Sequence, residues 1–465
     1  MGVSTTGFWA DVRESILGTQ QDFTDGSVSR AITLLSIPMV LEMSMESLFG
    51  VVDVFIMARL GADAVATVAF TESLLTLVFA VAMGLSMGTT AMVARRIGER
   101  DPAGASVVAG QAIGAGVAVS IPIGIVGVLL APQLLRWMGA SAKVVEIGST
   151  YNAIVLGGSV TILLLFLINA VFRGAGDAVL AMRALWLANL INMALDPCLI
   201  FGWGPFPEMG LVGGAIGTTV GRGLGVLYQL WVLFSKRPRV ALQPQHLRPD
   251  FAVLQKLWRL SFTGILQWFI ATASWLGLVR LIAIFGSVAL AGYGIALRII
   301  IFAILPSWGM SNAAATLVGQ NLGAGKPERA EKSVWWTGLY NAVFLSGVAL
   351  VFIIFAEPLV RIFTQDPAVI LVGVDCLRYV SYGYGFYAYG MVMVQAFNGA
   401  GDTTTPTLIN LFCYWLWQIP LAYCLALWAG LGAKGVFLAI TISESTVAVV
   451  GIALFRRGKW KQQKV

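Results

Sequence analysis

Polar side chains that could bind a cation lie within a strongly hydrophobic stretch of the sequence, residues 189–202. Asn189, Asn192 and Asp196 are its polar members. On an α-helix these three side chains fall within about 40° of one another and form one polar stripe. A carboxylate at membrane depth is costly and therefore indicates a function. Because Asn192 and Asp196 are one helical turn apart, we expect their oxygen atoms to converge on a single ion or proton.

The composition of the chain is that of a polytopic membrane protein. Of its 465 residues, 58% are hydrophobic and 11% are charged, whereas about a quarter of the residues in soluble proteins are charged. The first 30 residues have no apolar core, so we expect no cleavable signal peptide. The single histidine, His246, lies in a polar segment, and the four cysteines lack metal-ligand spacing. Neither a zinc site nor a histidine-based catalytic centre is expected, and the chain is predicted not to be an enzyme.

Twelve apolar runs are long enough to cross a hydrocarbon core of about 30 Å. The first six cover roughly 32–58, 64–92, 106–131, 147–171, 179–203 and 211–235. The second six cover roughly 257–283, 288–315, 333–355, 370–396, 405–428 and 434–455. The sequence therefore predicts an all-α polytopic membrane protein with twelve transmembrane helices.

The two sets of six runs are related by an internal repeat. Phe172–Asp177 recurs as Phe397–Asp402, a shift of 225 in sequence number, and Gly84-Leu-Ser86 recurs as Gly309-Met-Ser311 at the same shift. After the fifth run the shift falls to 222. A repeat with an even number of helices inserts both copies the same way up, which predicts two pseudo-symmetric six-helix lobes in parallel orientation. Two such lobes suit alternating access, and a duplication without transport is the alternative.

The predicted segments follow from the lobes. They are a cytoplasmic N-terminal segment 1–31, an N-lobe 32–235, a cytoplasmic linker 236–256, a C-lobe 257–455 and a basic cytoplasmic tail 456–465. Nineteen Lys and Arg residues lie in the loops and tail on the side of the linker, against six on the opposite side. The positive-inside rule therefore places both termini in the cytoplasm. The basic excess is a topology signal and requires no nucleic-acid partner.

Three predicted helices bring polar groups to a similar depth in the first lobe. Counted from the outer loops, Asp53 lies about 9 Å deep, and Asp196 and Thr218 lie about 12 Å deep. Together with Asn192 they form a set of oxygen ligands that suits Na⁺. Two desolvated carboxylates suit a proton equally well.

The second lobe reproduces these depths without the acids. The positions that correspond to Asp53 and Asp196 are Leu278 and Leu421. Glu444, in the last run, is a weaker candidate for a functional carboxylate.

Two further acids, Glu42 and Glu46, lie within about 40° of Asp53 on a helical wheel. They would extend the acidic face toward the cytoplasm and attract a cationic substrate or relay protons. The alternative is that they pair with buried bases or lie in a wet crevice for structural reasons. Tyr387 belongs to a region rich in tyrosine and methionine that could bind flat cations by cation–π contacts, although such residues also occur in ordinary helix packing.

The chain resembles the MATE family, the multidrug and toxic compound extrusion transporters, from about residue 32 to residue 457. The resemblance is carried by Pro38, Asp53, Leu195-Asp196-Pro197, Gly213–Thr218, Gly319–Pro327 and Asn398–Thr403. It implies two six-helix lobes that form a V and exchange organic cations for Na⁺ or H⁺. It also implies an N-lobe cation site, possible for Na⁺, at Asp53, Asn192, Asp196 and Thr218.

Two departures from the family pattern bear on the site. Some relatives carry acids in the seventh and tenth helices, but the matching positions here are Ala271 and Tyr387. Glu42 and Glu46 replace the neutral residues expected on that face.

The resulting prediction is a secondary active multidrug efflux transporter that antiports cationic amphipathic molecules against Na⁺ or H⁺ by alternating access. The alternative is a flippase or exporter of a lipid-linked or specific metabolite substrate on the same scaffold. No cofactor is expected beyond the coupling ion. The expected partners are small organic cations and the lipid bilayer, and the protein is expected to be a monomer in a bacterial-type cytoplasmic membrane. Glu42, Glu46, Asn189 and Tyr387 are the candidate residues for a substrate or proton path.

Overall fold

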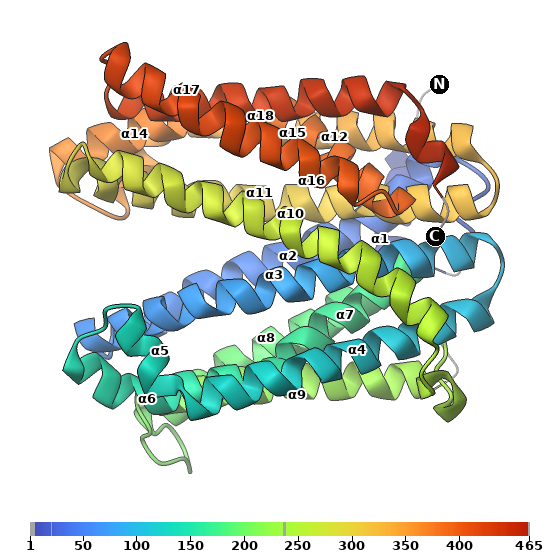
Figure 1. Cartoon of the computed structure of the whole chain (residues 1–465), viewed down its shortest axis with the longest axis horizontal. Coiled ribbons are helices and arrows are strands. Elements are labelled where there is room, and N and C mark those ends of the chain that lie inside the picture. Colours follow the sequence, from blue (N-terminus) through green and yellow to red (C-terminus); the bar gives the residue numbers. More distant parts are fainter. Residues whose placement is uncertain (1–4, 20, 236–238, 464–465) are drawn as a thin grey trace. The chain divides into compact units, whose positions relative to one another are not determined.

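The secondary structure of the chain is entirely helical over the residues that the computed structural model describes, 5–19, 21–235 and 239–463, with no β-strand among them (Figure 1). Residues 1–4, 20, 236–238 and 464–465 lie outside this description. These residues include the start of the predicted linker 236–256 and the outer ends of the predicted segments 1–31 and 456–465. The predicted all-α class is confirmed.

Nine helices in the described part of the chain are long and apolar enough to cross a membrane, with mean hydropathy between 1.4 and 2.4. The runs predicted as the first, sixth and tenth spans are also helical, although they are not among these nine. The count of twelve spans therefore stays a prediction.

The chain divides into two compact units. Unit 1 consists of Met1–Ser15, Gln20–Val40 and Leu266–Val465, and unit 2 consists of Ile16–Thr19 and Leu41–Ile265. Three boundaries between the units fall within helices: after Ser15 in α1 (Thr5–Leu17), after Val40 in α2 (Val28–Ala58) and after Ile265 in α10 (Phe251–Ala283). The predicted segment boundaries, after residues 31, 235, 256 and 455, stay a prediction.

The helices of the first half follow the chain in order. They are α1 (Thr5–Leu17), α2 (Val28–Ala58), α3 (Ala62–Gly98), α4 (Pro102–Leu129), α5 (Ala131–Trp137), α6 (Ala142–Gly157), α7 (Ser159–Ala175), α8 (Ala178–Phe201), α9 (Leu211–Phe234) and the short 3₁₀ helix η1 (Pro244–Leu247). The predicted fourth span is thus two helices, α6 and α7, that meet at Gly158.

The second half repeats this order. It contains α10 (Phe251–Ala283), α11 (Ser287–Gly323), α12 (Pro327–Ile354), α13 (Ala356–Arg361), α14 (Pro367–Ser381), α15 (Tyr384–Ala400), α16 (Thr404–Asn410), η2 (Leu411–Gln418), α17 (Ile419–Tyr423), η3 (Cys424–Trp428), α18 (Ala433–Arg456) and η4 (Lys459–Gln462). The segments η2 and η3 are π-helical, so the predicted eleventh span alternates between α- and π-helix.

The internal repeat is visible in the backbone. Gly176 ends α7 at φ 86°, and Gly401, its counterpart in the repeat, ends α15 at φ 85°. Gly210 precedes α9 at φ 55°, and its counterpart Gly432 precedes α18 at φ 59°. Glycine adopts these positive φ values without the steric cost of a side chain. The shift between counterparts is 225 at Gly176 and 222 at Gly210, because the connection before α18 is shorter than the one before α9.

Close helix packing at Gly84 and Gly309 also follows the repeat. A Cβ atom on Gly84 of α3 would collide with Ile265 of α10 within unit 2. A Cβ atom on Gly309 of α11 would collide with the backbone of Met39 of α2 within unit 1. The first parts of α2 and α10 are thus held by equivalent glycines, each within its own unit.

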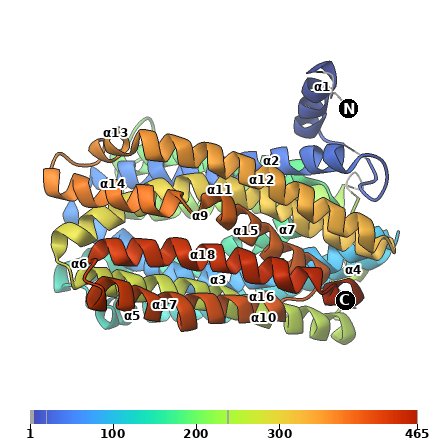
Figure 2. The same cartoon turned by 90° about the horizontal axis from the view of Figure 1, so that it is seen from above.

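The N-terminal helix α1 is tied to the start of α2. Arg30 forms ion pairs with Asp11 at 2.9 Å and with Glu14 at 2.6 Å. Figure 2 shows α1 running across the direction of the long helices of unit 1.

Candidate functional site

The polar stripe predicted for residues 189–196 lies on α8 and is buried. Asn189, Asn192 and Asp196 are 4%, 2% and 0% exposed. The helix that carries them begins after Gly176, in the left-handed conformation, and ends at Gly202, which is also left-handed. Nδ2 of Asn192 donates a hydrogen bond of 3.1 Å to Oδ1 of Asp196. The expected convergence of these two side chains, one turn apart, is therefore present.

Thr218 joins this pair from the neighbouring helix α9. Nδ2 of Asn192 also donates to Oγ1 of Thr218 at 3.1 Å. Glycines bring the two helices close: a Cβ atom on Gly217 would lie against Oδ1 of Asp196, and one on Gly221 would lie 2.7 Å from the carbonyl oxygen of Ala188. The absence of side chains at these glycines lets Asn192 bridge α8 and α9.

Two oxygen atoms in this cluster have no hydrogen-bond donor. Oδ1 of Asn192 and Oδ2 of Asp196 are buried without a partner among the described residues. Buried polar atoms are nearly always hydrogen-bonded, so two orphaned acceptors in adjacent side chains require an explanation. A cation or a proton would satisfy both atoms. The donor set, one carboxylate, one amide oxygen and one hydroxyl, is chemically suited to Na⁺ and does not exclude H⁺.

Asp53 lies on α2, and its charge acts on this cluster. It is half-buried, and its carboxylate interacts electrostatically with Asp196. The structure shows no direct hydrogen bond between Asp53 and Asn192, Asp196 or Thr218, all of which it describes. Asp53 is thus a charged neighbour of the three-residue cluster, in the same unit.

An arginine completes the electrostatics of the cluster. Arg222 of α9 lies one turn after Thr218 and interacts electrostatically with both Asp53 and Asp196. The sequence reasoning passed over this residue, although an arginine inside an apolar run is itself a functional signal. Arg222 supplies a positive charge that can balance one of the two carboxylates.

Glu42, predicted for a substrate or proton path, is engaged in a buried network. Nη1 of Arg173 on α7 lies 2.7 Å from Oε1 of Glu42, and the two side chains are 8% and 1% exposed. Nδ2 of Asn169 donates to the same oxygen at 2.9 Å, and Nε2 of Gln229 on α9 donates to Oδ1 of Asn169 at 2.6 Å. The geometry favours the structural alternative for Glu42, because its carboxylate is paired with a base.

Arg173 is a second buried base of this unit. The sequence pattern counts it among the nineteen basic residues on the side of the linker. In the structure its side chain is buried against α2.

Glu46 and Asn189 form a separate contact. Nδ2 of Asn189 donates to Oε2 of Glu46 at 3.0 Å, and Glu46 is half-buried. These two candidates are therefore brought together by α2 and α8.

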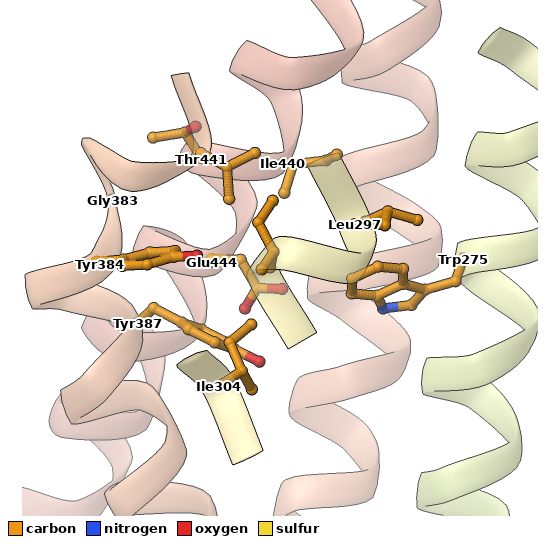
Figure 3. A pocket seen from close by; sticks show the side chains of 11 residues that line it. Trp275, Leu297, Ile304, Gly383, Tyr384, Tyr387, Ile440, Thr441 and Glu444 are labelled. Atoms are coloured by element: carbon orange, nitrogen blue, oxygen red, sulfur yellow. The ribbon is translucent and has the colours of Figure 1, made fainter. Parts of the chain in front are cut away.

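Tyr387 does not belong to this cluster, since α15 lies in unit 1. There it lines a small cavity together with Tyr384, Trp275, Thr441 and Glu444 (Figure 3). This cavity lies inside unit 1, among α10, α11, α14, α15 and α18.

Comparison with known proteins identifies the family. A sequence profile of the MatE family matches residues 38–198 and 260–424. A protein of Thermotoga maritima described as the probable multidrug resistance protein NorM is 27% identical over 444 residues, which are 94% of each chain. A protein of Shewanella oneidensis described as an FAD transporter is 25% identical over 92% of this chain and 94% of its own.

A solved structure supports the same assignment. An outward-facing multidrug resistance MATE family transporter of the MOP superfamily matches with a TM-score of 0.89 and 27% identity. The match covers 95% of this chain and 98% of that one. The chain is therefore a multi-pass membrane transporter rather than an enzyme, and it belongs to the MatE family.

Proposed function

We propose that the protein exports cationic, amphipathic small molecules in exchange for Na⁺ or H⁺. The observation that carries the proposal is the pair of orphaned acceptors, Oδ1 of Asn192 and Oδ2 of Asp196. The coupling ion binds at Asn192, Asp196 and Thr218, with Asp53 as the neighbouring charge. The descriptions of relatives as multidrug resistance proteins support the substrate class.

Coupling requires the ion to stabilise one conformation more than the other, because a ligand shifts an equilibrium only by its differential affinity. Asn192 bridges α8 and α9, and Asp53 adds the charge of α2. An ion bound between these groups holds three helices in one arrangement, and its release leaves repulsion between Asp53 and Asp196 that Arg222 partly offsets.

The protein is proposed to act as a monomer in the cytoplasmic membrane, with both termini in the cytoplasm. The asymmetry of Lys and Arg between the two sets of loops supports this orientation.

A second candidate function is export of an anionic metabolite. Arg222 favours it, because this base lies among the site residues and could bind an anionic group. The relative described as an FAD transporter shows that one similar protein is assigned such a substrate.

The test is transport in reconstituted vesicles with Na⁺ and pH gradients imposed separately. The cationic dye ethidium should be exchanged for one of the two ions, and Asp196→Asn should abolish the gradient-driven part of this flux. Glu146→Gln, at an exposed acid on α6, serves as the matched acid-to-amide control. Normal coupled efflux by the Asp196→Asn protein would show that the coupling site lies elsewhere. Gradient-driven flux of FAD but not of ethidium would favour the second candidate.

A further inference from the structure

Unit 1 contains one buried carboxylate that the proposed mechanism does not use. Glu444 of α18 is 8% exposed, and its one hydrogen bond among the described residues comes from the hydroxyl of Tyr414, 3.2 Å from Oε2. No Lys, Arg or His is among the eleven described residues that line the adjoining cavity. A lone charged carboxylate in such surroundings is very unfavourable, because no cationic side chain of the lining compensates it.

The cavity beside Glu444 is small. Its volume is about 20 Å³, which is enough for one water molecule. Figure 3 shows the carboxyl group of Glu444 pointing into the space between Tyr384, Tyr387 and Trp275. The remaining lining is mostly aliphatic, from Leu297, Ile300, Ile304, Val380 and Ile440.

One polar group that lines this cavity is not satisfied by a hydrogen bond. The hydroxyl of Tyr384, a side chain that is 1% exposed, has no hydrogen-bond partner in the described part of the chain. The titratable side chains that face Glu444 are Tyr384 and Tyr387 of α15, together with Cys413 and Tyr414 of η2. None of these carries a positive charge, so none of them offsets an ionised Glu444.

Tyr414 lies in a helix of unusual geometry. It belongs to the π-helical segment η2, and the hydroxyl of Ser443, next to Glu444, donates to the carbonyl oxygen of Cys413 at 2.8 Å. π-Helical turns are rare and are often found at functional sites. The Glu444 carboxyl group is therefore hydrogen-bonded to a side chain of a π-helical segment.

We propose that Glu444 is a proton-binding site of unit 1, which holds a proton in its mostly apolar surroundings and releases it when water enters the cavity. We assign a proton rather than Na⁺, because the lining is mostly aliphatic and aromatic and Glu444 is its one carboxylate among the described residues. This site is separate from the Asn192 and Asp196 cluster, which lies in unit 2. The claim that proton binding at Glu444 drives export rests on the proposed function. The claim that Glu444 binds a proton does not.

The site is tested by infrared spectroscopy of the purified protein in lipid nanodiscs near neutral pH. The wild-type protein should show a band of a protonated carboxyl group that Glu444→Gln loses. Glu146→Gln, the exposed control, should keep this band. An unchanged band in the Glu444→Gln protein would overturn the proposal.

A second variant protects the test against misfolding of Glu444→Gln. Tyr414→Phe keeps the acid and removes its hydrogen-bond donor, so the band should remain and shift to higher frequency. A band that does not respond to Tyr414→Phe would contradict the assigned contact. Exchange of KCl for NaCl should leave the band unchanged, and its loss in NaCl would show a sodium site instead.

Transport separates this inference from the proposed function. In vesicles, Glu444→Gln should lose pH-driven ethidium flux yet keep the exchange of labelled for unlabelled ethidium without a gradient. Full pH-driven flux in this variant would overturn the coupling role. If the wild-type protein shows no ion-driven flux at all, the proposed function fails while the infrared result still decides whether Glu444 binds a proton.

Discussion

Glu42 on α2 and Arg173 on α7 form a buried ion pair, with 2.7 Å between Oε1 and Nη1. The two residues lie far apart in the sequence, and both side chains are buried. The pair joins α2 to a network that continues through Asn169 to Gln229 on α9. Glu42 thus links α2 to α7 and α9 through Oε1, whereas its Oε2 is buried without a hydrogen-bond partner among the described residues.

Breaking this pair should destabilise the protein strongly. Glu42→Gln leaves Arg173 as a buried charge with a weaker partner, and loss of one member of a buried pair costs about 3–5 kcal/mol. Replacing both residues by leucine should cost less than the single change, because no uncompensated charge remains. Thermal unfolding of the purified protein measures both effects. Glu357→Gln is the control, since its pair with Arg361 is about half exposed and is worth about 0–1 kcal/mol. Equal losses from Glu42→Gln and Glu357→Gln would contradict the buried pairing.

The approach of α9 to α8 should be required for coupling. Gly217→Ala adds a methyl group against Oδ1 of Asp196, with Nδ2 of Asn192 3.6 Å away. The carboxylate must shift, so ion-driven flux should fall while the protein still inserts and purifies. Gly223→Ala on the same helix is the matched control, because its nearest neighbour would be Cγ2 of Thr161 at 3.8 Å, an ordinary contact. Equal ion-driven flux in the two variants would show that the position of Asp196 is not critical.

Glu46 should act on cationic substrates through its charge. Glu46→Gln retains an acceptor for Nδ2 of Asn189 and should cost about 1 kcal/mol of stability or less. If the charge attracts the substrate, KM for ethidium should rise while kcat changes little. Asn189→Ala removes the donor but leaves the charge, so it should not raise KM. A rise in KM in both variants would assign the effect to the hydrogen bond instead.

The connection between α7 and α8 at Asp177 should show a defined pH dependence. Asp177 lies between α7 and α8, where burial raises its pKa although the backbone N–H and the charge of Arg239 lower it. A raised pKa means that the folded state binds the proton more tightly than the unfolded chain. The stabilisation from this group is therefore present below the unfolded value of about 3.9 and is lost as pH rises through the folded value.

Asp177→Asn tests this sign. The amide keeps an acceptor for the backbone N–H of Arg239, which lies 3.0 Å from Oδ2 in the wild-type protein. At neutral pH the variant should match or exceed the thermal stability of the wild type, and the difference should shrink toward about pH 4. A variant less stable at neutral pH by more than about 1 kcal/mol would show that the ion pair with Arg239 outweighs the cost of burial.

The sequence by itself determined the helices, the repeat and the pair of residues one turn apart. Hydrophobic run length sets where helices can cross a membrane, and the recurrence of Gly176 and Gly401 set the relation between the two halves. The 3.6-residue period places Asn192 and Asp196 on one face, so their contact needed no knowledge of the fold. Local spacing determines such neighbours because they share a helix.

Only the tertiary structure decided which groups from different helices meet. Arg173 and Glu42, Arg222 and Asp53, or Tyr414 and Glu444 are joined by the rotation and close approach of separate helices, which no local period encodes. For the same reason, the sequence offered Glu444 only as a weaker candidate, whereas the structure shows its buried carboxylate facing a small cavity. The cost of burying a charge depends on what surrounds it, and those surroundings exist only after the helices have packed.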